Sequence, residues 1–149
     1  MIEIRKAKLS DSECIVEFQL QMAQETEALE LDREVVCRGV RGVFDEPARG
    51  TYWIAAEDGK ILGVFLAIPE WSDWRNATVL WIHSLYIVPE ARRRGVFKML
   101  YRNLEQQVKK SPELAGIRLY VDKTNHSAQN IYQKLGMNKE HYEMYEWLK

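Results

Sequence analysis

Hydrophobic positions near the start of the chain change from a strand-like to a helix-like spacing. Ile2 and Ile4 alternate with charged residues, which predicts a short edge strand. Ser10 followed by Glu13 fits a capping box, a common start of a helix. The helical spacing continues through Ile15, Phe18, Met22, Ala28 and Leu29. We therefore expect a short strand and then a helix that begins near Ser10.

A second helix is predicted directly after the first. Asp32 is a suitable N-cap, and Pro47 and Gly50 would stop the helix. Its apolar positions are Val35, Val36, Val40 and Val43. Gly39 and Gly42 weaken the prediction, because each glycine costs about 1 kcal/mol relative to alanine inside a helix.

The middle of the chain has the pattern of strands. Tyr52–Ala56 reads as a strand, and Asp58-Gly59 is a two-residue hairpin turn into a second strand at Ile61–Ile68. A polar and aromatic loop, Glu70–Asn76, leads to a third strand at Ala77–Val88. Because this third strand is apolar on both faces, we expect it to be central and covered on both sides.

Helices and strands alternate in the last third of the chain. An amphipathic helix is predicted at Gly95–Lys110, a strand at Ile117–Val121, a helix at Ser127–Leu135 and a last strand at Tyr142–Leu148. No repeat, linker or low-complexity segment interrupts the sequence. The pattern predicts one mixed α/β (α+β) domain over residues 1–149.

Composition narrows the classes of function. Lys and Arg total 21 against 22 for Asp and Glu, so a general nucleic-acid surface is disfavoured and any positive site must be local. No apolar run approaches the roughly 20 residues that cross a bilayer, and the N-terminus does not resemble a signal peptide. A cytoplasmic location without a membrane partner is expected.

Cysteine and histidine residues show no metal-site pattern. Cys14 and Cys37 stand alone in predicted helices, where burial as small hydrophobic side chains is favoured over a reactive thiol. His83, His126 and His141 lack ligand spacing with a cysteine or a pair of carboxylates. We therefore expect no metal.

The segment after the third predicted strand combines positive charge with a helix start. Arg92, Arg93 and Arg94 precede Gly95, and Lys98 follows in the first turn. Backbone N–H groups at a helix N-terminus lack internal partners and attract anions, so this site suits a pyrophosphate. Three arginines by themselves are more often solvated charge, and neither a GxxxxGK[ST] nor a GxGxxG string is present.

Two motifs resemble one family. Arg92-x-x-Gly95-x-Phe97, preceded by Leu85–Pro89, resembles the coenzyme A signature of the GNAT (GCN5-related) N-acetyltransferase superfamily, and Asn125–Met137 resembles its second conserved element. The predicted element order is also similar along nearly the whole chain. The resemblance implies a mixed, mostly antiparallel central sheet with helices on both faces, and acetyl-CoA as co-substrate.

Phe97 departs from the usual pattern, which has glycine or alanine at that position. Its side chain would have to point away from the phosphates, or the loop would fit differently. In either case the backbone N–H groups from Arg93 to Lys98 could still bind the phosphates. The upstream segments Glu70–Asn76 and Met22–Glu27 resemble one branch of the superfamily in which Phe97 would be normal.

The resemblance assigns roles to residues of this chain for direct attack of an amine on the thioester. Leu85, Tyr86 and Ile87 would hold the pantetheine arm, and a backbone N–H at a strand irregularity near Ile87 would stabilise the oxyanion. The pyrophosphate would lie against Arg92, Arg93, Arg94, Gly95, Val96, Phe97 and Lys98. Asn125 would also contact the cofactor. Tyr132 would contact it as general acid, although either residue could instead cap or pack a helix.

The general base and the acceptor stay open. Tyr120 stands where some relatives place a glutamate, so Glu25, Glu27, His83 and Asp122 are candidates, with His83 equally suited to a core position. Glu25, Glu27 and Asp73 near an aromatic wall favour a cationic amine, such as a polyamine, an aminoglycoside-like sugar or a lysine or N-terminal amine.

The sequence leaves the role of the two loop tryptophans open and allows two functions other than catalysis. Trp71 and Trp74 fit either a dimer contact or an acceptor-site wall, and relatives are often homodimers. A non-catalytic acyl-CoA-binding sensor or structural module is the main alternative to catalysis. A nucleic-acid partner is least favoured because the total charge is nearly neutral.

Overall fold

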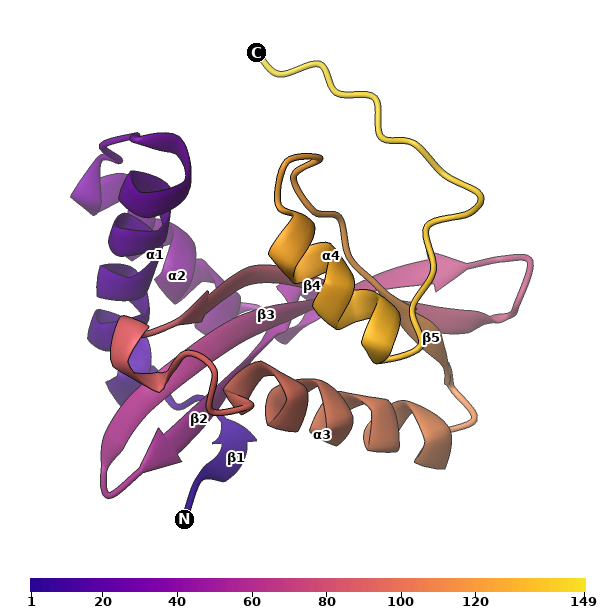
Figure 1. Ribbon diagram of the computed structural model, residues 1–149, viewed down its shortest axis with the longest axis horizontal. Coiled ribbons are helices and arrows are strands. Elements are labelled where there is room, and N and C mark those ends of the chain that lie inside the picture. Colours follow the sequence, from indigo (N-terminus) through magenta and orange to yellow (C-terminus); the bar gives the residue numbers. More distant parts are fainter. The chain divides into compact units, whose positions relative to one another are not determined.

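The computed structural model describes all residues from 1 to 149, in two compact units, residues 1–118 and residues 119–149. The first unit contains β1 (Glu3–Lys6), α1 (Ser12–Glu27), α2 (Arg33–Asp45), β2 (Thr51–Glu57), β3 (Lys60–Ser72), β4 (Ala77–Ile87), α3 (Val96–Lys110) and β5 (Leu114–Arg118) (Figure 1). Short 3-10 turns lie at η1 (Leu9–Asp11), η2 (Pro47–Arg49) and η3 (Pro89–Ala91). The second unit contains α4 (His126–Lys134).

The five strands of the first unit form one sheet in the order β1-β2-β3-β4-β5. The pairs from β1 to β4 are antiparallel, whereas β4 and β5 are parallel. The β4–β5 register ends at the pair Trp81–Arg118, although β4 continues to Ile87. The last part of β4 therefore has β3 on one side and no strand of the first unit on the other.

Helices of the first unit cover both faces of this sheet (Figure 1). Tyr52 of β2 packs on Phe44 of α2, and Tyr86 of β4 packs on Phe18 of α1, with ring centroids 5.8 and 5.2 Å apart. On the opposite face, Gly63 of β3 lies next to α3. The most deeply buried large side chains come from both layers: Phe65, Ile15, Ile54, Leu100, Leu104, Val64 and Val96. The predicted mixed sheet with helices on both faces is confirmed.

Local signals located most element boundaries. Asp32 caps α2, where its carboxylate accepts hydrogen bonds from the N–H groups of Glu34 at 2.9 Å and Val35 at 3.2 Å. Asp58 and Gly59 form the expected hairpin turn, with positive φ angles of 50° and 78°. α2 also continues through Gly39 and Gly42 without a break.

The predicted start of α1 at Ser10 is wrong. Ser10 lies in η1, and α1 begins at Ser12. Asp11, the residue before α1, is fixed by its side chain. Its carboxylate accepts hydrogen bonds from the Lys8 N–H at 2.7 Å and from the Arg5 guanidinium at 2.8 and 3.1 Å. A local cap at Lys8 and Asp11 therefore takes the place of the expected Ser10–Glu13 capping box, and Arg5 of β1 holds the Asp11 carboxylate.

Strand boundaries were predicted less well. β3 continues to Ser72, so the first part of the predicted loop, Glu70–Ser72, pairs with β4. β5 spans Leu114–Arg118 instead of Ile117–Val121. The predicted last strand at Tyr142–Leu148 is wrong, because these residues form no ladder. Alternation indicates a tendency to be extended, but a strand also needs a neighbour to pair with.

Other expectations concern cysteines and membranes. Cys14 and Cys37 are half-buried, and burial raises the pKa of the Cys14 thiol, which disfavours its reactive thiolate form. Among the helices, none combines the length and the apolar character that crossing a membrane requires.

Candidate functional site

A β-bulge interrupts β4 at the positions where the sequence predicts cofactor contacts. Val64 pairs with Tyr86 and Leu66 pairs with His83, so Ser84 and Leu85 together face the single residue Phe65. Ser84 adopts a left-handed conformation, with φ of 52°. The irregularity expected near Ile87 therefore lies slightly upstream, at Ser84–Leu85.

The bulge brings His83 and Tyr86 to the same face of the sheet. In a regular strand, residues three positions apart point to opposite faces. The extra residue at the bulge reverses this rule. His83 consequently faces the same side as Tyr86, which contacts α1 through Phe18.

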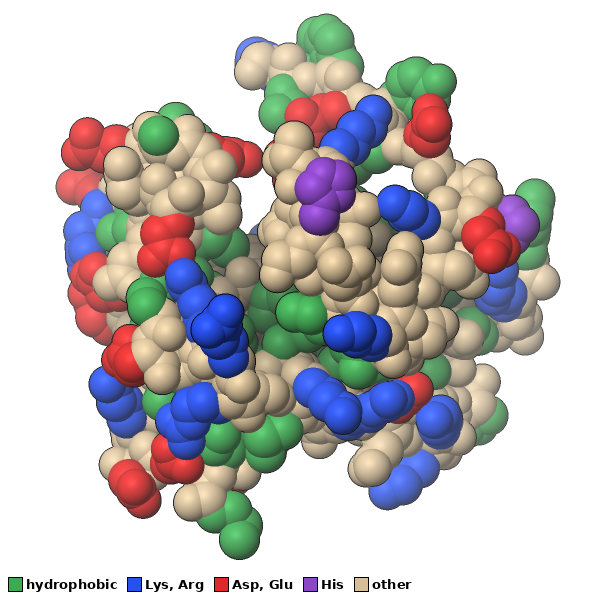
Figure 2. Space-filling model, in the orientation of Figure 1, with side chains coloured by type: hydrophobic (Ala, Val, Ile, Leu, Met, Phe, Trp, Pro, Cys, Tyr) green, Lys and Arg blue, Asp and Glu red, His purple; other side chains and the backbone are tan.

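The start of α3 has the features of an anion site. No side chain caps the helix, so the N–H groups of its first turn, from Val96 to Lys98, have no helix-internal acceptor. Gly95 has φ of 76°, and Arg93 also lies in the left-handed region, at 65°. On the face shown in Figure 2, Lys and Arg side chains gather over the connection between β4 and α3 and along α3. This geometry and charge fit a phosphate group.

The three arginines before α3 have different partners. Arg92 donates from Nη2 to Glu25 at 2.6 Å and from Nε to the Ile87 carbonyl at 3.0 Å. Arg94 pairs with Glu57 at 2.7 Å. Arg93 and Lys98 are exposed and have no ion pair. Sequence analysis assigned all three arginines to the pyrophosphate. In the structure only Arg93 has no ion-pair partner.

Glu25 joins the end of α1 to β4 and to Arg92. The Tyr86 hydroxyl lies 3.0 Å from both Gln21 Oε1 and Glu25 Oε1, and it donates its single proton to one of them at a time. The hydrogen bond from Arg92 lowers the pKa of the Glu25 carboxyl below its ordinary value, with a smaller contribution from Tyr86. Burial and the neighbouring Glu25 raise the pKa of the Tyr86 phenol. Glu25 is thus a carboxylate at neutral pH and a weak base.

The remaining base candidates differ in their surroundings. His83 is half-buried, and burial lowers its pKa below 6.5, which keeps the imidazole neutral at pH 7. Glu27 is exposed as the last residue of α1. Asp122, in the second unit, accepts hydrogen bonds from the Thr124 N–H at 2.8 Å and hydroxyl at 2.6 Å, which lower its pKa and fit a turn-forming role.

In the second unit, the two residues of the downstream motif lie at the start and near the end of α4. Asn125 caps the helix, with its side-chain oxygen 3.1 Å from the Ala128 N–H. Burial raises the pKa of the Tyr132 phenol, so this side chain is a protonated donor at neutral pH. The helix ends at Lys134, and Gly136 follows in a left-handed conformation with φ of 93°.

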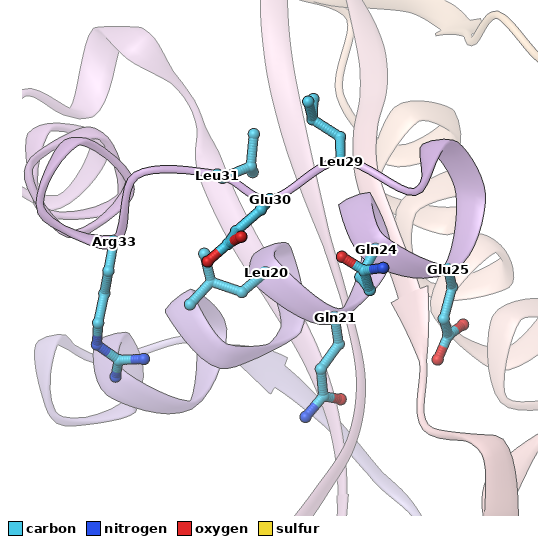
Figure 3. Close-up of a pocket in the computed structure, with 8 residues that line it drawn as sticks. All are labelled: Leu20, Gln21, Gln24, Glu25, Leu29, Glu30, Leu31 and Arg33. Carbon is cyan, nitrogen blue, oxygen red and sulfur yellow. The ribbon is translucent and has the colours of Figure 1, made fainter.

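An open groove of about 520 Å3 lies between α1 and the segment that leads to α2 (Figure 3). Ala28 ends α1 in a left-handed conformation, and the next N–H, of Leu29, returns to the Ala23 carbonyl at 3.2 Å. The chain therefore folds back over the helix. The residues that line the groove are Leu20, Gln21, Gln24, Glu25, Leu29, Glu30, Leu31 and Arg33.

Trp71 and Trp74 lie far from this groove. They are 63% and 89% exposed at the end of the β3–β4 hairpin. Trp71 pairs with Thr78, and Thr78 lies seven positions before Leu85 on β4, which is about 23 Å at the usual rise of a strand. The tryptophans therefore do not form a wall beside the bulge.

Sequence reasoning did not find Gln21 or Glu57 and did not predict the Glu25–Arg92 pair. Gln21 and Glu25 lie four positions apart on α1, a spacing that indicates a shared helix face, but nothing in the sequence pairs that face with β4.

The mixed sheet, the bulge in β4 and the uncapped start of α3 define an α/β fold with a candidate anion site at the end of the β4–α3 connection. The sequence model of the acetyltransferase (GNAT) family matches residues 15–137, and the chain belongs to this family. The resemblance inferred from the two motifs is thus confirmed.

Solved structures agree with this assignment. A "possible acetyltransferase" from Clostridium difficile 630 is 37% identical, with a TM-score of 0.93 over 100% of this chain and 98% of that one. Glucosamine-6-phosphate N-acetyltransferase from Arabidopsis thaliana is 18% identical, with a TM-score of 0.75 over 100% and 99%. Ribosomal-protein-alanine N-acetyltransferase from Brucella melitensis biovar Abortus 2308 is 12% identical, with a TM-score of 0.81 over 100% of each chain. The last two share the fold alone. None of the curated proteins compared matches the chain.

Proposed function

We propose that the protein transfers the acetyl group of acetyl-CoA to a primary amine by direct attack in a ternary complex. The observation that carries this proposal is the sequence of three features along one segment: the bulge at Ser84–Leu85, the tight turn at Arg93–Gly95 and the uncapped start of α3. Together they would offer hydrogen-bond donors to the acyl end and to the pyrophosphate of the same molecule.

The cofactor contacts follow from the available backbone and charges. The backbone of Leu85, Tyr86 and Ile87 would bind the pantetheine arm, because β5 leaves that edge of β4 unpaired. The N–H groups of Val96–Lys98 would bind the pyrophosphate, assisted by the side chains of Arg93 and Lys98. Arg92 would position this loop through Glu25 instead of contacting phosphate. Asn125 of the second unit remains a predicted contact.

In the reaction, the amine nitrogen forms a bond to the thioester carbon, and the carbon–sulfur bond breaks. A backbone N–H at the bulge would stabilise the oxyanion, since a bulge leaves a backbone group outside the ladder. Tyr132 would donate a proton to the leaving sulfur. His83 would accept the proton of the amine, because it is neutral at pH 7 and shares a face with Tyr86.

A panel of amines with acetyl-CoA tests this proposal. Thiol release that depends on the amine, together with a product heavier by one acetyl group, is the expected result. Acetyl-CoA binding in a calorimeter without thiol release for any amine would favour the non-catalytic acyl-CoA sensor instead. No binding at tens of micromolar would contradict both functions.

A cytoplasmic location, a homodimer and the absence of metal, nucleic-acid and membrane partners stay predictions from the sequence. A small-molecule amine and a lysine or N-terminal amine both fit the proposed chemistry. The open groove beside Glu25 is the feature that discriminates between acceptors.

A further inference from the structure

The groove on α1 has an apolar floor, and this floor is built by the left-handed end of the helix. Because Ala28 reverses the chain, Leu29 and Leu31 lie near Leu20 of α1. Leu20 and Leu31 are half-buried and Leu29 is 45% exposed. Such a cluster gains from being covered by an apolar chain of a ligand.

Carboxylates accompany the leucines on separate sides of the groove. Figure 3 shows the Glu25 and Glu30 carboxylates on opposite sides of Gln24. Glu25 lies on the side of the groove that faces the β4 bulge, because its carboxylate accepts a hydrogen bond from the hydroxyl of Tyr86, which follows the bulge. Glu30 is exposed and has no ion pair.

The single cation of the groove does not neutralise Glu30. Arg33 contacts both Glu13 and Glu17 at 2.6 Å, so its charge is already matched by two carboxylates. Arg92 likewise matches Glu25. The groove and its rim therefore keep negative charge, which disfavours phosphorylated or carboxylated acceptors and favours cations.

We propose that this groove binds a linear aliphatic diamine or polyamine as the acetyl acceptor. The amine to be acetylated lies beside Glu25, the methylene groups cover Leu20, Leu29 and Leu31, and the second ammonium group lies against Glu30. The inference rests on the proposed acetyl transfer and names its substrate class. The Glu30 carboxylate at one end of the apolar groove would attract a second ammonium group. A monoamine of the same length lacks this second ammonium group and would not gain from the carboxylate.

A matched pair of acceptors tests this inference. 1,5-Diaminopentane and n-pentylamine have the same carbon chain and differ in the second amine. For the wild-type protein we expect kcat/KM to be about fivefold higher for the diamine, the upper range for an exposed ion pair. Glu30→Gln should reduce this preference to about twofold, the statistical factor for the two equivalent amino groups of the diamine. Glu34→Gln changes an exposed acidic residue in the first turn of α2 outside the groove and should leave the preference unchanged.

Two results would overturn the inference alone: a diamine preference in the wild-type protein no greater than the statistical factor of about two, or a preference as large in Glu30→Gln as in the wild-type protein. Thiol release with aromatic amines, amino sugars or a lysine peptide, but not with the diamine, would also overturn it and leave acetyl transfer intact. If none of the amines supports thiol release, that result would instead contradict the proposed function.

Discussion

At the scale of single residues, the bulge in β4 decides which side chains meet. His83 and Tyr86 would point to opposite faces of an uninterrupted strand, and the left-handed Ser84 brings them to one face. Glu25, whose carboxylate lies 3.0 Å from the Tyr86 hydroxyl, is held as a carboxylate by Arg92. These contacts support the proposal that Glu25 positions the site and that His83 accepts the proton.

Replacement of His83 tests the base. His83→Gln should lower kcat about 100-fold with a reactive amine, a typical contribution of general base catalysis. The wild-type histidine accepts a proton only when neutral, so its advantage is present above its pKa and lost below it. Because burial lowers that pKa below 6.5, the ratio of wild-type to variant kcat should be constant at neutral pH and fall in acid.

When both proteins are measured with the same acceptor, the protonation of the amine affects both kcat values equally and therefore drops out of their ratio. His141→Gln, at an exposed position outside any helix or strand, is the matched control and should retain wild-type kcat at every pH. A ratio near one at neutral pH would show that His83 is a core residue without a catalytic role.

Tyr132→Phe tests the general acid. Removing the hydroxyl should lower kcat about 10- to 100-fold, because the leaving sulfur loses its proton donor, with little change in the Kd for acetyl-CoA. Stopped-flow thiol release and calorimetry measure the two quantities separately. Unchanged turnover would contradict the assignment of Tyr132.

At the scale of elements, local signals and distant contacts contribute differently. The cap at Asp32 and the turn at Asp58-Gly59 were predicted because they depend on neighbouring residues. The junction of α1, β4 and the arginine segment was not predicted, because Glu25 and Arg92 lie 67 positions apart in sequence. The start of α1 was predicted wrongly for a different reason, since the cap is formed by Lys8 and Asp11 and not by Ser10 and Glu13.

The β4–α3 connection predicts different roles for neighbouring arginines. Arg93→Gln should raise the Kd for acetyl-CoA about tenfold, because the exposed guanidinium would lose a charge-assisted hydrogen bond to phosphate. Arg94→Gln is the matched control, since Arg94 is already paired with Glu57, and it should change the Kd less than threefold. Calorimetry at two salt concentrations measures both; equal effects of the two substitutions would contradict the separation of roles.

Two glycine substitutions test how the elements constrain the backbone. Gly50→Ala should reduce the free energy of unfolding by about 2 to 4 kcal/mol, because the new Cβ would lie 2.8 Å from the Ala67 carbonyl oxygen at φ of 150°. Gly39→Ala should increase it by about 1 kcal/mol, since the position is inside α2 with no atom in the way. Urea unfolding monitored by circular dichroism gives both values; a stable Gly50→Ala protein would contradict the close approach of β2 and β3.

At the scale of the whole molecule, the periodicity of the sequence predicted the fold class, and two spaced motifs identified the family, as the family match confirms. The alternation at Tyr142–Leu148 predicted a strand that does not form, because pairing depends on a neighbour that the sequence does not name. The proposed cofactor segment could be predicted from the sequence because its motif is contiguous. The proposed acceptor groove could not, because it depends on the fold-back of the chain at Ala28.

The central claim is amine-dependent acetyl transfer from acetyl-CoA, and its most direct test is the initial rate of thiol release with and without an amine, paired with mass spectrometry of the acceptor. The account predicts release that saturates with the amine, one acetyl group added per thiol released, and strong loss of both in Tyr132→Phe. Acetyl-CoA that binds but yields no acetylated amine across aliphatic, aromatic, sugar and peptide acceptors would contradict it.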